Sequence, residues 1–315
     1  MKPQVSRRRF LTMTAAFAAL PAMADTTRPV AEWRGTALGA KASLRLVGVS
    51  GEEARDTFAA VEAELVRLEG IFSLYKADSD LSRLNRAGRL SAPPHEMLEL
   101  LSLVGSVHAS TNGAFDPTIQ PLWALYAETK GHQPDKSMLT AALGRTGWAK
   151  VRITRSEIAF AQPGMALTLN GIAQGYITDR VAGLLRRRGF DNVLVDMGEI
   201  VGLGQRGDGG AWRIGVSTPD GYIVRRTTLS DRALATSSPM GTLFDDKGNV
   251  GHILDPRRGA PMAVRELVSV SADRAALADA LSTAFCIMDD AEAAAALEVH
   301  PTARLEVARH LIRVA

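Results

Sequence analysis

The segment Leu167-Thr-Leu-Asn-Gly-Ile-Ala-Gln-Gly-Tyr176 decides how this chain divides into strands and helices. Residues 165–170 have the composition of a strand, and residues 172–188 carry the apolar spacing of a helix. A helix N-terminus after a strand offers free backbone N–H groups to an anion. Gly171 and Gly175 would let a ligand approach the backbone closely. The alternative is an ordinary tight turn with no ligand.

The rest of the chain mixes strand and helix patterns without strict alternation. Strand patterns cover residues 41–47, 157–160, 192–197, 212–217, 222–229, 267–271 and 304–314. Helical patterns cover residues 52–72, 95–111, 137–143, 273–288 and 292–300, and residues 79–88 form a loop or a short helix. This mixture favours an α+β fold with mixed or antiparallel sheets and flanking helices. No linker or repeat divides residues 25–315, which we therefore predict to be one catalytic domain.

Residues 1–24 have the pattern of a cleaved export signal. A twin-arginine motif, Ser6-Arg-Arg-Arg-Phe-Leu11, is followed by a short apolar stretch and an A-x-A cleavage site before Asp25. These residues carry one lysine, three arginines and no acid, so their removal changes the formal net charge from +3 to −1. The mature protein then has no basic surplus that would favour nucleic acid or a membrane. We expect a periplasmic protein that uses the twin-arginine route.

The motif Ala278-Asp-Ala-Leu-Ser-Thr283 places two hard oxygen donors on one face of the last long helix. Asp279 and Thr283 are four residues apart and therefore share that face. A carboxylate and a hydroxyl suit Mg²⁺ or Ca²⁺ better than Zn²⁺. Two ligands are typical of a magnesium site that is completed by substrate phosphates. The alternative is a solvated helix face, with Asp273 at the start of the helix.

A third motif, Gly251-His-Ile-Leu-Asp-Pro256, contains the histidine that is best placed for acid–base chemistry. His252 stands beside a turn that Asp255-Pro256 makes rigid. The alternative is a hairpin in which His252 bonds only to backbone. The single cysteine, Cys286, has apolar neighbours and is expected to fill the core. A nucleophile elbow, a Walker A loop and a dinucleotide-binding glycine pattern are all missing from the sequence.

Taken in order, these motifs resemble those of the ApbE family, the FAD:protein FMN transferases. The resemblance covers most of residues 25–315. It rests on these segments: Phe72-Ser-Leu-Tyr75, Asp78-Ser-Asp-Leu-Ser-Arg-Leu-Asn85, Gly113-Ala-Phe-Asp-Pro-Thr118, Leu169-Asn-Gly-Ile-Ala-Gln-Gly-Tyr176 with Asp179, Ala235-Thr-Ser-Ser238, His252-Ile-Leu-Asp-Pro256 and Ala278-Asp-Ala-Leu-Ser-Thr283.

The resemblance implies that the protein splits FAD and transfers FMN to a threonine or serine hydroxyl of a partner flavoprotein, releasing AMP. It implies that Mg²⁺ is held by the Gly171 carbonyl, Asp279 and Thr283, and His252 is our candidate for proton transfer. The residues expected to hold FAD are Leu38, Tyr75, Asn85, Ala114, Phe115, Asp116, Thr168, Gln174, Thr236, Ser237 and Ile253.

Several positions depart from the family pattern. Thr168 stands where an acid is usual, Gln174 where a lysine is common, and Leu38 where a methionine is usual. Residues 195–200 and Ser238 also differ from the common forms. Together with twin-arginine export, these variants are similar to the subgroup associated with nitrous-oxide reductase maturation. That similarity implies a membrane-bound FMN-binding protein of nitrous-oxide respiration as the acceptor.

Two other functions are compatible with the same motifs. One is an FAD pyrophosphatase that releases FMN and AMP without an acceptor. The other is a non-catalytic periplasmic flavin carrier, which the departures at Thr168 and Gln174 favour. Retention of Asp279 and Thr283 favours an enzyme, because a carrier has no need to keep a metal.

Overall fold

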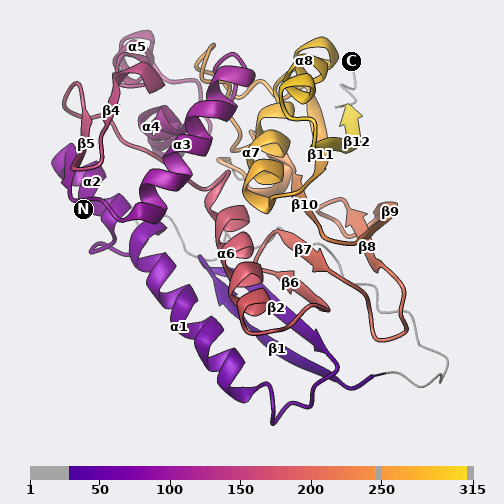
Figure 1. Cartoon of the computed structure of the whole chain (residues 1–315). Helices are drawn as coiled ribbons and strands as arrows, with labels where there is room; N and C mark the ends of the chain where they lie inside the picture. Colours follow the sequence, from indigo (N-terminus) through magenta and orange to yellow (C-terminus); the bar gives the residue numbers. More distant parts are fainter. Residues whose placement is uncertain (1–27, 246–249, 311–315) are drawn as a thin grey trace.

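The computed structural model describes residues 28–245 and 250–310 (Figure 1). The export signal at residues 1–24 and the end of the last predicted strand, residues 311–314, lie outside the described residues. The strands are β1 (Val30–Ala37), β2 (Ala40–Val47), β3 (Arg89–Ser91), β4 (Val151–Ile153), β5 (Glu157–Phe160), β6 (Val193–Asp196), β7 (Ile200–Leu203), β8 (Trp212–Ser217), β9 (Ile223–Leu229), β10 (Arg232–Ser237), β11 (Arg265–Ala272) and β12 (Arg304–His310). The helices are α1 (Arg55–Phe72), α2 (Asp80–Ala87), α3 (His95–Ser110), α4 (Gln120–Glu128), α5 (Lys136–Gly144), α6 (Ala173–Arg187), α7 (Ala275–Phe285) and α8 (Asp290–Val299), with short 3₁₀ turns at Pro117–Ile119, Trp148–Lys150 and Pro239–Gly241.

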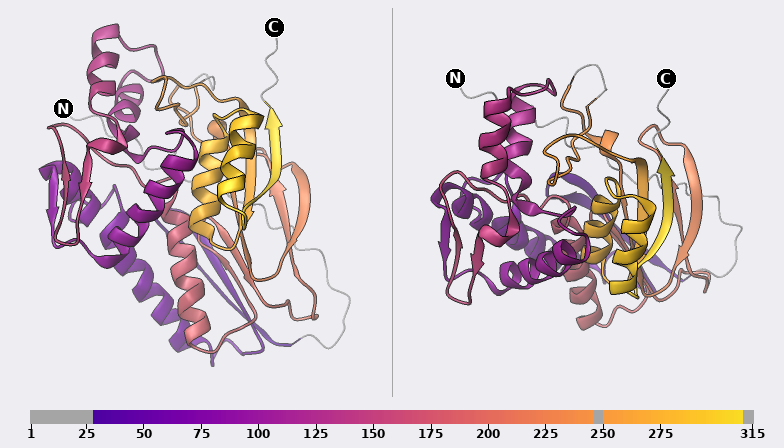
Figure 2. Two further views of the ribbon diagram at one scale, coloured as in Figure 1. Left: turned by 45° about the horizontal axis from the view of Figure 1, so that its top comes forward. Right: turned by 90° about the horizontal axis from the view of Figure 1, so that it is seen from above.

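A seven-stranded sheet forms the centre of the molecule and confirms the α+β class. Its order is β1-β2-β6-β7-β10-β11-β12, and every neighbouring pair is antiparallel. Helices α6 and α7 lie side by side on one face of this sheet, and α1 and α3 pack against them (Figure 1). The β8–β9 ribbon lies against the other face (Figure 2). Helices α4 and α5 pack on each other beyond the end of α3, beside a small sheet of β3, β5 and β4.

Alternation along the central strands explains why both faces of the sheet are covered. Val193 and Val195 of β6 belong to the large core under α6 and α7, whereas Leu194 belongs to the smaller core under β8 and β9. Successive side chains of a strand point to opposite faces, so one strand serves two cores. Among the described residues, no helix is long and apolar enough to cross a membrane.

The structure corrects the prediction for the segment before α6. Residues 165–170 were expected to form a strand that pairs with residues 157–160, but they form no strand, and β5 pairs with β3 and β4. The Asn85 side chain forms hydrogen bonds with both the amide and the carbonyl of Leu167. The Thr168 amide donates to the Pro117 carbonyl at 2.8 Å. These bonds replace a strand ladder because long-range contacts satisfy the same backbone groups. Sequence patterns also missed β1, β3, β4, β7, β10 and α4.

The last long helix is shorter than predicted and begins differently. It spans Ala275–Phe285, whereas the sequence pattern predicted residues 273–288. Asp273 does not cap it, since that carboxylate accepts a bond from Thr302 Oγ1 at 2.7 Å. Instead the carboxylate of Asp179, on α6, accepts from the amides of Ala275 and Ala276 at 2.7 and 3.0 Å. One helix therefore caps its neighbour and fixes how the two are aligned.

Gly175 allows α6 and α7 to touch. An added Cβ would lie 2.4 Å from the Ala275 carbonyl oxygen and 2.7 Å from Ala276 Cα. Both contacts are with backbone, which cannot rotate away. Gly175 was expected to let a ligand approach the backbone, and the structure corrects this expectation, because the neighbouring helix α7 occupies that space.

We expect Gly175→Ala to lower the free energy of unfolding by about 3 kcal/mol, since the methyl group forces the two helices apart. Gly183→Ala is the matched control in the same helix, because its Cβ would meet only the flexible end of Arg187, at 3.4 Å. That control should gain up to about 1 kcal/mol from helix propensity. Urea unfolding of both variants measures the difference. Equal effects of the two substitutions would contradict this account of Gly175.

Candidate functional site

A cavity of about 180 Å³ opens where α6, α7, β10 and the loops after β1, α1 and α3 meet. Its lining includes residues from all of the family-like segments quoted above except residues 78–85, and these residues are separated by up to 245 positions in the sequence. The lining residues are Leu38, Ala40, Phe72, Ser73, Leu74, Tyr75, Ala114, Phe115, Asp116, Pro117, Ile119, Trp123, Thr168, Asn170, Gly171, Gln174, Glu199, Thr236, Ser237, Thr242, His252, Ile253, Leu254, Pro256, Asp279 and Thr283.

The deep end of the cavity brings together Gly171, Asp279 and Thr283. An added Cβ at Gly171 would lie 3.0 Å from Thr283 Oγ1, so the 171 turn lies directly against α7. Ser237 Oγ of β10 lies 3.3 Å from the same hydroxyl and 2.7 Å from Ser282 Oγ. Backbone of the turn, a carboxylate and a hydroxyl, the three groups that the resemblance assigns to one site, therefore lie at the same end of the cavity.

Asp279 is a buried carboxylate with little to neutralise it. It is 4% exposed, and its Oδ2 accepts one bond from the Gly175 amide at 3.1 Å. Burial, followed by the neighbouring charge of Asp179, raises the pKa of Asp279 to about 7. Among the described residues that line the cavity, none is a lysine or an arginine. A buried carboxylate without a cationic partner is an environment that a metal ion can satisfy.

His252 is oriented by two carbonyl groups. Its Nδ1 lies 3.0 Å from the Pro239 oxygen and 3.1 Å from the Thr242 oxygen. Two acceptors at one nitrogen place the proton on Nδ1, which leaves Nε2 as the basic atom. Burial lowers the pKa of His252 below the usual 6.5, so the ring is neutral at pH 7. Gly251 permits this arrangement, because a Cβ there would lie 2.3 Å from the Pro239 oxygen.

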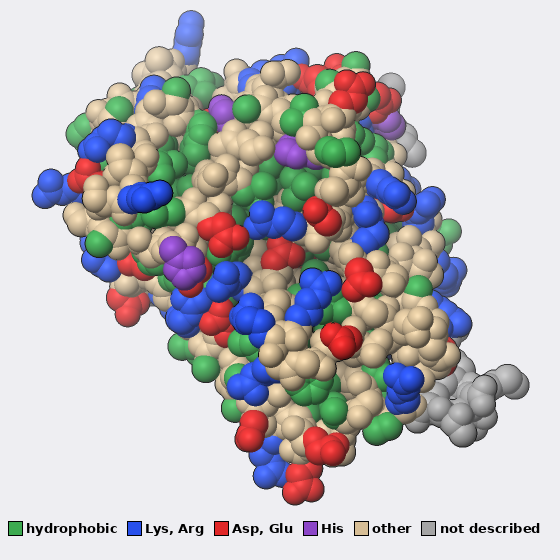
Figure 3. All heavy atoms as spheres, in the orientation of Figure 1, with side chains coloured by type: hydrophobic (Ala, Val, Ile, Leu, Met, Phe, Trp, Pro, Cys, Tyr) green, Lys and Arg blue, Asp and Glu red, His purple; other side chains and the backbone are tan. Residues whose placement is uncertain are grey.

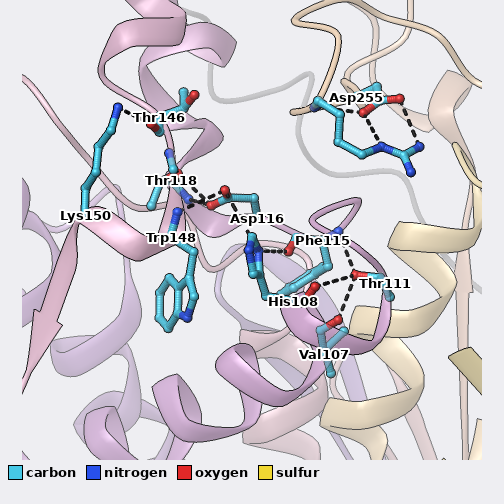
Figure 4. A network of polar contacts seen from close by, with 12 residues as sticks. Val107, His108, Thr111, Phe115, Asp116, Thr118, Thr146, Trp148, Lys150 and Asp255 are labelled. Carbon is cyan, nitrogen blue, oxygen red and sulfur yellow. Dashed lines mark hydrogen bonds and ion pairs between the residues drawn. The ribbon is translucent and has the colours of Figure 1, made fainter. Parts of the chain in front are cut away.

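Two carboxylates hold the walls of the cavity rather than acting within it (Figure 4). Asp116 accepts from the amide and hydroxyl of Thr118 at 2.8 and 2.6 Å and from the Trp148 amide at 3.2 Å. Asp255 forms a two-pronged pair with Arg257, at 3.0 and 3.1 Å. These bonds fix the 114–118 and 252–257 turns, and they confirm the rigid turn predicted at Asp255-Pro256.

Comparison with known proteins decides the family. The ApbE family model matches residues 38–307. The chain belongs to the ApbE family. Curated relatives include FAD:protein FMN transferases of Klebsiella pneumoniae, 28% identical over 81% of this chain and 76% of the relative, and of Salmonella typhimurium, 26% identical over 78% and 75%.

Solved structures of ApbE proteins have the same fold. The flavin transferase ApbE of Vibrio cholerae superposes with a TM-score of 0.76 at 26% identity and covers 88% of this chain and 93% of its own. The apo flavinyl transferase ApbE of Pseudomonas stutzeri gives a TM-score of 0.74 at 27% identity, with 87% and 89% covered. The α+β domain described above is therefore the fold of this family.

Most residues expected to hold FAD line the ApbE cavity. Tyr75 lies at its rim, half exposed, and Ala114, Phe115 and Asp116 form one wall. The remaining expected residues that line it are Leu38, Thr168, Gln174, Thr236, Ser237 and Ile253. The structure therefore brings these positions together around one cavity.

Asn85 is placed differently from the prediction. Its Nδ2 donates to the Leu167 carbonyl at 2.8 Å, and its Oδ1 accepts from the Leu167 amide at 2.7 Å. Asn85 is also outside the cavity lining. Both bonds join the Asn85 side chain to the backbone of Leu167. Asn85 therefore positions the 167–171 turn and does not face a ligand.

Two acidic residues near the site were not predicted to have roles. Asp179 caps α7, and burial raises its pKa to about 6. Glu199 lines the cavity and is 8% exposed; burial and then the charge of Asp279 raise its pKa well above the usual value. Asp179 belongs to a quoted motif, and Glu199 follows the Asp196-Met-Gly turn. The signal in the sequence that could have indicated Glu199 was an acidic residue directly after a glycine turn.

Proposed function

We propose that this ApbE protein transfers FMN from FAD to a serine or threonine hydroxyl of an acceptor protein, releasing AMP. The observation that carries the proposal is the cavity itself. It joins Gly171, Asp279 and Thr283 at one end with the basic Nε2 of His252 within a single lining. The names of the curated relatives support the same activity.

The residues at the deep end fit a magnesium ion. Gly171 leaves space beside Thr283, and Asp279 is buried without a basic partner in the described lining. We propose that the Gly171 carbonyl, Asp279 and Thr283 hold Mg²⁺, as oxygen ligands suit that ion. When bound, the ion would supply charge neutralisation for the pyrophosphate of FAD.

The transfer requires one bond to form and one to break. The acceptor hydroxyl oxygen bonds to the FMN phosphorus, and the bond from that phosphorus to the AMP oxygen breaks. His252 Nε2 takes the hydroxyl proton, and the leaving AMP phosphate carries away the electron pair. A neutral imidazole held at Nδ1 by two carbonyl groups is suited to this step. The apolar wall formed by Phe115, Ile253 and Leu254 would exclude water from the phosphorus.

Incubation of the mature protein with FAD, MgCl₂ and a candidate acceptor tests the proposal. The expected result is an acceptor whose mass rises by one FMN group, with AMP released in equal amount. Free FMN with AMP and an unmodified acceptor would support the pyrophosphatase alternative. Unchanged FAD would support a flavin carrier. The same assay with peptides from several candidate acceptors, including an FMN-binding membrane protein of nitrous-oxide respiration, would identify which acceptor is modified.

We also propose export through the twin-arginine route and action in the periplasm. The support is the order of basic, apolar and small residues in 1–24. N-terminal sequencing of protein recovered from periplasm should begin at Asp25. Recovery of the uncleaved chain from the cytoplasm alone would contradict this proposal.

A further inference from the structure

Glu199 is an acidic residue of the cavity lining that has no role in the reaction proposed above. It lies on the turn between β6 and β7, and its Oε2 accepts from the Thr236 amide at 3.3 Å. Within residues 28–245 and 250–310, its carboxylate has no other hydrogen bond and no ion pair. A carboxylate that is 8% exposed and has one weak partner lacks the hydrogen bonds and the counter-charge that a buried ionised group needs.

The turn that carries Glu199 is held firmly against α6. Gly198 has φ +105°, and an added Cβ there would lie 2.5 Å from Nε2 of Gln174. The Thr178 hydroxyl lies 3.3 Å from the Glu199 carbonyl oxygen. The position of Glu199 is therefore set by backbone contacts, and the residue that faces its turn is a neutral amide.

The charges around the cavity do not balance. Asp279 and Glu199 are both buried in the described lining of the same cavity, and the charge of Asp279 acts on Glu199. Lys and Arg side chains lie elsewhere, for example over the middle of the face shown in Figure 3. Arg180 and Arg187 line a separate pocket beside α6. The pyrophosphate of FAD would add two further negative charges. A divalent cation is the species that resolves this surplus.

We propose that Glu199 is a second carboxylate of the cation site: together with Asp279, it supplies the two negative charges that hold a divalent cation before FAD enters. The inference rests on the proposed function in taking the deep end of the cavity as the cation site. It assigns Glu199 to cation affinity, whereas Thr283 and the Gly171 carbonyl contribute uncharged oxygens. Gln174 faces the Glu199 turn and is neutral, so it does not offset the negative charge of Glu199 as a lysine at this position would.

Titration calorimetry of the nucleotide-free mature protein with MgCl₂ tests this inference. Glu199→Gln removes the charge but keeps an oxygen for the Thr236 amide, and it should raise the Kd for Mg²⁺ by about tenfold or more. Gln174→Lys adds a positive charge beside the same turn and should also raise the Kd. Glu298→Gln, an exposed acid on α8, is the matched control and should leave the Kd unchanged. Thermal unfolding without metal should confirm that all three variants fold.

Two results would overturn the inference. One is a folded Glu199→Gln variant whose Kd stays within about twofold of the unsubstituted protein. The other is an unsubstituted protein that binds no Mg²⁺ without FAD. Failure of the proposed function looks different, since the protein would then bind Mg²⁺ through Glu199 and yet leave the acceptor unmodified.

Discussion

Asp279→Asn should reduce kcat/KM for FMN transfer by at least about 10³-fold, because the cation that neutralises the pyrophosphate loses its buried charged ligand. The amide oxygen of asparagine can still accept from the Gly175 amide, which the native carboxylate contacts at 3.1 Å. The fold should therefore persist. Time courses of acceptor mass at several FAD concentrations provide the measurement.

Three further variants separate a cation role of Asp279 from general damage. Thr283→Ser keeps the hydroxyl and should retain most activity, whereas Thr283→Val removes it and should resemble Asp279→Asn. Asp191→Asn, an exposed acid before β6, should behave as the unsubstituted protein. Transfer by Asp279→Asn at more than about a tenth of the native rate, with a native melting curve, would contradict the assigned role.

His252→Asn should lower kcat by about 10²- to 10⁴-fold, the usual effect of losing a general base. Asparagine is the informative replacement because its amide nitrogen can still donate to the Pro239 and Thr242 carbonyl groups. The variant removes the basic Nε2 and leaves the turn anchored. Rates should be measured at saturating FAD, so that the comparison reports the transfer step.

The pH dependence of the His252 reaction has a definite sign. Burial lowers the pKa of His252 from 6.5, so the folded protein keeps a neutral imidazole where an unfolded chain is protonated. The group therefore contributes stability above pH 6.5 that is lost as the pH falls through its lower folded pKa. At saturating MgCl₂, where a bound cation keeps Asp279 ionised, activity should persist below pH 6.5 and then fall, and His252→Asn should lack this acid limb. A native profile with its acid midpoint above 6.5 would argue against His252 as the base.

Local patterns in the sequence were enough to predict the helices that carry the site and the types of side chain that meet there. The helical spacing of α6 and α7 is continuous, and Asp279 and Thr283 share a face because four residues make about one turn. The motifs at 113–118 and 252–256 were recognisable as turns because proline and aspartate restrict the backbone locally. These features depend on neighbours in the chain, so sequence alone could report them.

Contacts between distant segments determined the rest. Asn85 was expected to face FAD, yet it holds Leu167, which is 82 residues away. Gly175 was expected to admit a ligand, yet it admits the backbone of α7. The local pattern of residues does not show which distant segment packs beside a glycine. It also does not show which distant backbone group bonds to a side-chain amide.

From its sequence, this protein could be read as an α+β chain with ApbE motifs, hard oxygen ligands and one well-placed histidine. Its tertiary structure decided which atoms of those residues remain available. Packing turned His252 so that Nε2 is the basic atom, joined α6 to α7 through Asp179, and buried Glu199 beside Asp279. The physical reason is that burial and hydrogen bonding set the charge and orientation of a side chain, and both arise only when distant segments come together.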